Sequence, residues 1–317
     1  MAQRPRVSVG CDVGGTNVKL VRLRDAELEA RLVIPTGGSG RASGFVSALA
    51  DAIASLLPRG RPGSPAGDRA VGVALPGFLD AKRGRVVYLS NVPALAGVPL
   101  RRRLAARLGC PVALDADTNA GAVGEAVLGA ARGRERVLYL TMGTGLGAAL
   151  AVRGEPVRVS HHTVGQVAHV PLEVSGPRCR CGERGCAEAL LSAKGILRLA
   201  AARGLEAAST LELRDLALGT TRGSRSLCRA ARSAWEETGR RLGRLCVALG
   251  ALFSPDAIVI GGGISGAAPL FLPEAARIVE ERLRPRIGRP VAVVPAALGA
   301  FAGAAGAAIL ARRAVNR

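Results

Sequence analysis

A chain of 317 residues is long enough to bury a sizeable core and to divide into two lobes of ordinary domain size. Its formal net charge of +20 comes almost entirely from arginines scattered among alanine and glycine, since Lys19, Lys82 and Lys194 are the only lysines. Aromatic residues, which stack on single-stranded bases, make up only 3% of the chain, so we expect weak nonspecific attraction to polyanions and no specific nucleic-acid partner.

The N-terminal segment, MAQRPRVSVGCDVGG, has neither the apolar run nor the small-residue cleavage site of a secretory signal. Four isolated cysteines are interpreted as small core residues rather than disulfide partners: Cys11, Cys110, Cys228 and Cys246. These features predict a cytoplasmic protein.

The first predicted element is a hairpin with a glycine-rich tip. Strands are expected over 7–13 and 18–24, joined by the turn GGTN, with a third strand near 28–34. Glycines let backbone amides approach a phosphate closely, and Asp12 is placed to orient a magnesium ion through water. Taken alone, a glycine-rich hairpin is a weak signal for phosphate binding.

Apolar spacing predicts a helix over 43–57 and a strand over 70–75 that leads into Pro76-Gly77. A short strand is expected over 111–114, after which DADTNAGAVGEA begins a helix. Acids at the carboxyl end of such a strand lie where α/β folds place ligands. Of the two acids here, Asp115 suits a role in capping the helix start.

The strand–glycine turn–strand pattern of the N-terminus recurs at 137–142, GTG and 146–152. The chain therefore contains two similar halves, each offering one glycine turn for phosphate. Two such turns facing each other would hold the β- and γ-phosphates of ATP between two lobes. This duplication is typical of the actin-like, ribonuclease H-like fold.

A cluster of metal-ligating residues follows, in the segment GQVAHVPLEVSGPRCRCGERGCAE. Cys179, Cys181 and Cys186 lie within eight residues, and His169 precedes them by ten. Three thiolates and one imidazole suit a closed tetrahedral zinc site, and Gly182 and Gly185 let the chain turn back around one ion. The alternative is a loop with free, buried or disulfide-bonded thiols, although three cysteines would leave one over.

The rest of the chain is predicted to be mostly helical. A long helix is expected over 224–253, with Leu242, Leu245, Leu249 and Leu252 in the core, and a buried strand over 257–260 ends in three glycines. The apolar run 291–310 is long enough to span a bilayer, but Pro295 and Gly299 interrupt it. We interpret it as a buried strand followed by a buried helix, and expect no membrane association.

Two motifs carry a family resemblance. The segment DVGGTN with the following Lys19 resembles the first phosphate motif of the actin-like ATPases. The pattern CxCGxxGCxE, preceded by GQVAH, resembles the signature of the ROK family of sugar kinases and sugar-responsive repressors. The GGG turn and the closing segment ALGAFAGAAGAAIL are also similar to family motifs, so the resemblance covers almost the whole chain.

The resemblance implies an ATP-dependent kinase that transfers the γ-phosphate to a hydroxyl of a sugar or polyol, by default a hexose such as glucose at its 6-hydroxyl. Alignment with the family motif E-N-D-A-N-A-A-A-x-G-E makes Asp117 the catalytic base, Asn119 part of the following helix and Glu125 its far end. The implied cofactors are ATP, Mg²⁺ and a structural Zn²⁺. The implied zinc ligands are His169, Cys179, Cys181 and Cys186. The implied nucleotide, phosphate and magnesium contacts are Asp12, Gly14, Gly15, Thr16, Asn17, Lys19, Gly143, Thr144, Gly145, Gly261, Gly262 and Gly263.

The implied substrate contacts are Gly77, Asn91, Asp117, Gln166, His169 and Glu188. For Gly77 and Asn91, a role as ordinary turn residues is an equally good reading. Ala116 stands where the family has an asparagine, Gln166 where it has a glutamate, and the loop VSHHTVG lacks the usual glycines. Because hydrogen-bonding sites discriminate strongly, an amino sugar, another modified sugar or a cyclitol is an alternative acceptor.

The expected architecture is a two-lobed α/β fold with a duplicated βββαβα core and a zinc loop. The small lobe would comprise 1–117, completed by the C-terminal helix 298–317, and the large lobe 118–297 would carry the zinc loop, nucleotide contacts and a dimer surface. A homodimer or homotetramer is expected. Two alternative functions are a transcriptional repressor and a sugar-binding protein with weak catalysis. The repressor is disfavoured because the hairpin that begins at Val7 is expected to leave no room before it for a DNA-binding domain.

Overall fold

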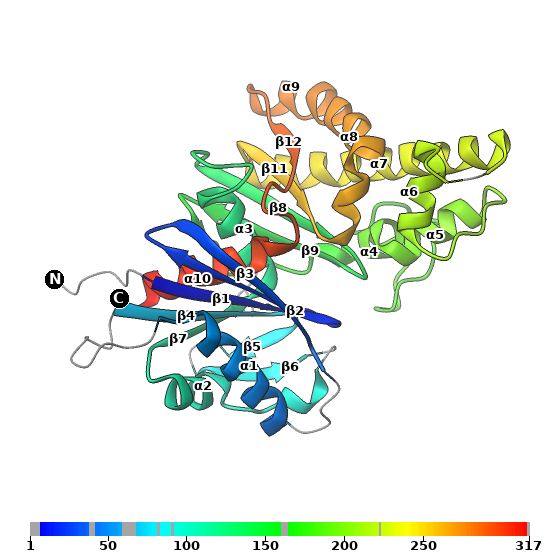
Figure 1. Ribbon diagram of the computed structural model, residues 1–317. Coiled ribbons are helices and arrows are strands. Elements are labelled where there is room, and N and C mark those ends of the chain that lie inside the picture. The colour runs from blue at the N-terminus through cyan, green and yellow to red at the C-terminus, as the bar shows by residue number, and fades with distance from the viewer. Residues whose placement is uncertain are drawn as a thin grey trace. The chain divides into compact units, whose positions relative to one another are not determined.

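The computed structural model describes residues 7–37, 42–58, 68–80, 83–89, 92–159, 164–221 and 223–315. The chain divides into two compact units (Figure 1). The first contains 1–133, 151–165 and 300–317, and the second contains 134–150 and 166–299. The first unit thus extends beyond the expected boundary at Asp117 and includes the C-terminal helix.

The first unit is built on a five-stranded sheet in the order β3-β2-β1-β4-β7. The first three strands form the antiparallel meander predicted from the sequence, and β4 and β7 run parallel to β1. Its strands are β1 (Val7–Val13), β2 (Asn17–Arg24), β3 (Glu27–Pro35), β4 (Arg69–Leu75) and β7 (Val112–Ala116). A separate hairpin pairs β5 (Phe78–Asp80) with β6 (Arg85–Tyr88).

The second sheet repeats this order as β10-β9-β8-β11-β12. Again an antiparallel meander comes first, and the last two strands run parallel to its first strand. Its strands are β8 (Arg136–Met142), β9 (Leu146–Val152), β10 (Glu155–Pro156), β11 (Ala257–Gly261) and β12 (Ala292–Pro295). The duplicated core predicted from the sequence is therefore confirmed.

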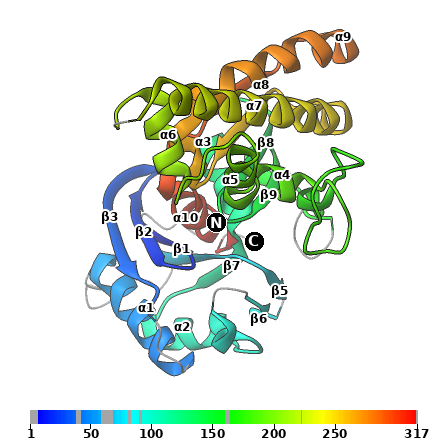
Figure 2. The ribbon, with the colours of Figure 1, turned by 90° about the vertical axis from the view of Figure 1, so that its right-hand side faces the viewer.

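The two faces of the first sheet are covered by different helices (Figures 1 and 2). Alternate residues of β1, such as Val9 and Cys11, pack in one apolar core with α1 (Ala42–Leu56) and α2 (Leu100–Leu108). In α2, Arg102 and Arg103 are exposed as expected, but Arg101 is half-buried. The opposite face is covered by α10 (Ala302–Ala314), which also packs against α3 (Asp117–Val127).

Glycines let α10 approach the sheet and α3 at backbone distance. A Cβ on Gly10 would lie 1.9 Å from the carbonyl oxygen of Ala304, and one on Gly72 would lie 1.9 Å from that of Ala307. A Cβ on Gly306 would lie 1.7 Å from the carbonyl oxygen of Ala120. The alanine- and glycine-rich composition of the C-terminal segment is therefore required by this packing. Among the described residues, no helix is both long and apolar enough to cross a bilayer.

The second unit is dominated by α7 (Arg225–Phe253), which packs along α8 (Ala268–Arg282) (Figure 2). Trp235 of α7 stacks on Phe271 of α8 with ring centroids 5.7 Å apart. Of the four leucines of α7 that were expected in the core, three are buried. The expectation was wrong for Leu252, which lies in the last helical turn and is 75% exposed. The shorter helices are α4 (Ala187–Leu191), α5 (Ala193–Ala201), α6 (Thr210–Leu218) and α9 (Arg284–Ile287).

Candidate active site and metal centre

Two carboxylates lie near each other in the first unit, at the ends of β1 and β7. Asp12 is the penultimate residue of β1, directly opposite Lys19 of β2, and Asp117 is the first residue of α3. Burial, together with the charge of Asp12, raises the pKa of Asp117 to about 7, in spite of the hydrogen bond from the backbone N–H of Thr118, which lowers it. Burial likewise raises the pKa of Asp12, and the positive charge of Lys19 lowers it, with a net pKa of about 6. A carboxyl with a pKa near neutrality is suited to accepting a proton at physiological pH.

The turn between β1 and β2 is held by its own backbone. The N–H of Gly14 donates to the carbonyl of Asn17 (3.0 Å), and the hydroxyl of Thr36 donates to the carbonyl of Gly14 (2.7 Å). Gly15, Thr16 and Asn17 are exposed at the tip. The tip of this turn is therefore open on its outer side.

The turn between β8 and β9 has a comparable closure. The N–H of Gly143 donates to the carbonyl of Gly145 (2.9 Å), and Ala193 at the start of α5 donates to the carbonyl of Gly143 (2.8 Å). A carboxylate oxygen of Glu188 accepts from the N–H of Leu146 (3.2 Å). Glu188, expected to face the substrate, thus also supports the second glycine turn.

The GGG segment lies beside this second turn. Gly262 has φ of +85°, and a Cβ there would lie 2.3 Å from the carbonyl oxygen of Met142, so only glycine fits without strain. The backbone nitrogen of Gly263 is 3.8 Å from where a Cβ on Gly143 would lie, and Gly263 is exposed. Gly261 is buried against the ring of Tyr139. The second unit therefore brings together two glycine segments that the sequence separates by more than a hundred residues.

The four expected metal ligands converge in the second unit, with their ligand atoms all within 4.8 Å of one another. Nδ1 of His169 lies 3.6 Å from Sγ of Cys179, and the Sγ atoms of Cys181 and Cys186 are 3.6 Å apart. Tetrahedral zinc with Zn–S bonds of about 2.3 Å places ligand atoms about 3.8 Å apart. The donor set therefore fits zinc in both chemistry and spacing.

The loop that carries these ligands is tightly folded. The N–H of Cys179 donates to the carbonyl of Glu183 (2.7 Å), and Gly185 has φ of +65° with its Cα against the backbone of Glu173. The carboxylate of Glu173 forms a two-point ion pair with Arg241 of α7 (2.8 and 3.1 Å). The loop is thus anchored to the longest helix of its unit.

The remaining substrate candidates are divided between the units. In the second unit, Gln166 is exposed and precedes the 3-10 helix Val167–His169, which contacts α4, where Glu188 lies. The ring nitrogen of His169 that lies next to a thiol is Nδ1. In the first unit, Gly77 is exposed at φ of +101° before β5, and Ala116 is buried. Asn91 and residues 160–163 of the VSHHTVG loop lie outside the described residues.

One cluster next to Asp117 was not predicted from the sequence. Asp115 does not cap α3; the N-cap residue is Ala116, and no side chain caps it. Instead the buried carboxylate of Asp115 accepts from Asn119 (2.8 Å) and pairs with Arg158. A buried strand acid signals that a cationic partner is required, but nothing in the sequence marks which arginine supplies it.

A family model for the ROK family matches residues 8–314. The chain belongs to the ROK family. It is 32% identical to a glucokinase of Streptomyces coelicolor over 96% of this chain and 98% of that protein. It is also 32% identical to a kanosamine kinase of Amycolatopsis mediterranei, over 96% and 95% of the two chains.

A solved ROK structure has the same fold. The glucokinase of Streptomyces griseus in complex with glucose and AMPPNP superimposes with a TM-score of 0.72 at 29% identity, covering 97% of this chain and 99% of that one. Together with the duplicated sheet order, this similarity establishes the two-lobed actin-like fold of ROK proteins for this chain.

Proposed function

We propose that the protein is an ATP-dependent kinase that phosphorylates a hydroxyl of a sugar or sugar-like polyol. The observation that carries the proposal is Asp117, a carboxylate with its pKa raised to about 7, near a second acid, Asp12, on a strand two places away in the same sheet. Support comes from ROK relatives that are sugar kinases and from a relative whose structure holds glucose and an ATP analogue.

In this proposal Asp117 is the general base. It accepts the proton of the attacking hydroxyl as that oxygen bonds to the γ-phosphorus and the bond to the β-phosphate oxygen breaks, leaving ADP. Phosphoryl transfer depends mainly on positioning and charge stabilisation, so the protein must align the hydroxyl and hold the phosphates. A base with a pKa near neutrality is deprotonated often enough to act and basic enough to take the proton.

The phosphate contacts are assigned to backbone amides. The amides of Gly15 in one turn and of Thr144 and Gly145 in the other would bind the phosphate oxygens, and residues 261–263 would line the nucleoside. The amides of Gly14 and Gly143, also expected to contact phosphate, instead donate to carbonyls within their own turns. Asp12 would hold Mg²⁺ through a water molecule. When bound, this ion would neutralise part of the negative charge of the phosphates. Lys19, opposite Asp12, keeps that carboxylate partly charged.

Zinc is assigned a structural role. His169, Cys179, Cys181 and Cys186 would saturate a tetrahedral ion and leave no open position for catalysis. Two residues after Cys186, Glu188 supports the second glycine turn, so the ion would fix both the substrate-facing residues and this turn.

We propose that glucose is a poor acceptor or is matched by another sugar or polyol. Ala116 and Gln166 replace two hydrogen-bonding family residues, whereas Asp117, His169 and Glu188 are kept. A lost hydrogen-bond partner costs about 1–3 kcal/mol, which corresponds to roughly tenfold to a hundredfold weaker glucose binding. The similarity to a kanosamine kinase makes an amino sugar a candidate acceptor.

A screen of ADP release with hexoses, amino sugars, N-acetylated amino sugars and cyclitols tests this function. We expect turnover that depends on both ATP and acceptor, with glucose poor or matched by another polyol. Absence of turnover with every acceptor would reject the kinase and favour a sugar-binding protein. A strong, exclusive preference for glucose would reject the acceptor assignment and keep the kinase.

A further inference from the structure

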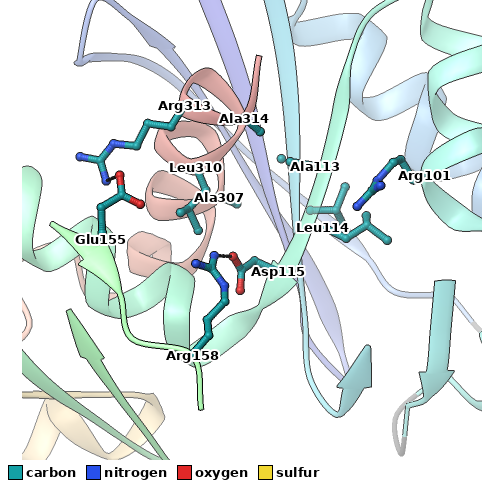
Figure 3. Close-up of a pocket in the computed structure, with 12 residues that line it drawn as sticks. Arg101, Ala113, Leu114, Asp115, Glu155, Arg158, Ala307, Leu310, Arg313 and Ala314 are labelled. Atoms are coloured by element: carbon teal, nitrogen blue, oxygen red, sulfur yellow. Dashed lines mark hydrogen bonds and ion pairs between the residues drawn. The ribbon is translucent and has the colours of Figure 1, made fainter. Parts of the chain in front are cut away.

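A cavity of about 150 Å³ lies at β7, between its last residues, the C-terminal half of α10 and the segment after β10 (Figure 3). Three arginines line it: Arg101, Arg158 and Arg313. Arg158 pairs with Asp115 and Arg313 with Glu155, so two of the three guanidinium groups already have carboxylate partners in the cavity wall. Because these charges are already paired, the cavity suits an anion less well than a structural role. We call the chain of contacts from Arg158 through Asp115 to Asn119 the relay.

The relay runs from the cavity to the start of α3. Arg158 donates to one carboxylate oxygen of Asp115, while the other accepts from the N–H of Ala116 (2.9 Å) and from Nδ2 of Asn119 (2.8 Å). The side chain of Asp115 is 10% exposed, and Asn119 is fully buried. Burying a carboxylate this deeply is costly unless it is paired, so the ion pair with Arg158 offsets the cost of holding Asp115 where it accepts both bonds.

Asp117 lies between the two residues that this relay joins. The N-cap residue of α3 has no side-chain cap, and within the first turn the N–H of Thr118 bonds to Asp117 itself (2.7 Å). The Asp115–Asn119 bond spans that turn and ties it to β7. Asp117 is the first residue of the turn that this bond ties to the strand.

We propose that Arg158 is a positioning residue for phosphoryl transfer, acting through Asp115 and Asn119 to hold the first turn of α3 and with it Asp117. The inference rests on the proposed role of Asp117 as base. Misplacing a reacting group by about 1 Å can cost about a hundredfold in rate, whereas binding of either substrate depends on many other contacts. The loss should therefore appear in kcat.

The test compares Arg158→Met with Arg313→Met in steady-state kinetics with the best acceptor found. The two arginines line the same cavity, each is ion-paired, and their side chains are 32% and 31% exposed. We expect Arg158→Met to lower kcat at least about tenfold, with KM for acceptor and MgATP within about threefold, and Arg313→Met to match the wild type. Arg158→Lys should recover part of kcat, because an ammonium group can replace the charge.

A second variant covers the possibility that Arg158→Met does not fold. Asp115→Leu/Arg158→Met removes both charges and also the acceptor of both bonds, and it too should show lowered kcat with nearly unchanged KM. Wild-type kcat in the double variant, or equal loss in Arg158→Met and Arg313→Met, would overturn the inference. Asp117→Asn separates this from failure of the proposed function: if that variant keeps normal turnover, the base assignment itself is wrong.

Discussion

At the residue scale, Asp117 is subject to opposing electrostatic effects. As the first residue of α3 it benefits from the partial positive charge of a helix N-terminus, yet burial and the neighbouring Asp12 raise its pKa. The folded pKa, about 7, lies above the unfolded value of 3.8, so the folded state prefers the protonated carboxyl. Stability from this group is complete below about pH 4 and is lost as pH rises through 7.

Asp117→Asn should therefore stabilise the protein at pH 8, because an amide removes the cost of the ionised carboxylate. One pKa unit corresponds to about 1.4 kcal/mol, and solvent screening of this partly buried group keeps the gain below the full shift. Thermal unfolding should show a higher Tm for the variant at pH 8 and little difference at pH 4. Asp51→Asn, at a side chain that is 70% exposed, serves as control; equal behaviour of the two variants at pH 8 would contradict the shifted pKa.

At the scale of single elements, the predicted zinc site makes the loop from His169 to Cys186 testable by metal analysis. We expect about one zinc per chain in protein purified without added metal, measured by elemental analysis. Cys181→Ser should lose the zinc and weaken acceptor binding, because a structural ion and its loop fold together. Zinc-free protein whose three thiols all react freely would rule the site out.

The packing of α10 gives a second element-scale prediction. Gly306→Ala would place a Cβ 1.7 Å from the carbonyl oxygen of Ala120, forcing α10 away from α3 and costing about 1–3 kcal/mol or more. Gly266→Ala is the matched control, since its nearest neighbour is 3.6 Å away. Urea unfolding should separate the two variants clearly. Equal stabilities would mean that α10 packs less closely than described.

Sequence patterns predicted the positions of helices, strands and turns better than they predicted contacts between residues far apart in the chain. Ser224 caps α7 as the predicted boundary requires, and both glycine turns join the strands expected of them. The pairing of Asp115 with Arg158 could not be predicted, because it joins residues 43 positions apart through tertiary packing alone. Similarly, helical spacing placed Leu252 in the core, but spacing does not say how far a neighbouring element extends along a helix.

At the scale of the whole molecule, duplication provides one glycine turn in each sheet, between β1 and β2 and between β8 and β9. The acid pair belongs to the first unit, and the metal centre and GGG segment belong to the second. The proposed kinase therefore draws on both units, and no single motif accounts for it. The expected homodimer or homotetramer stays a prediction.

The most direct test of the central claim measures turnover and acceptor binding in the same preparation of Asp117→Asn. We predict that ATP-dependent phosphorylation falls at least about a hundredfold, since general-base catalysis contributes about 10²–10⁴-fold. Acceptor affinity, measured by calorimetry, should stay within a few-fold of the wild type. Turnover near the wild-type level would contradict the account, because no role would remain for Asp117 in proton transfer.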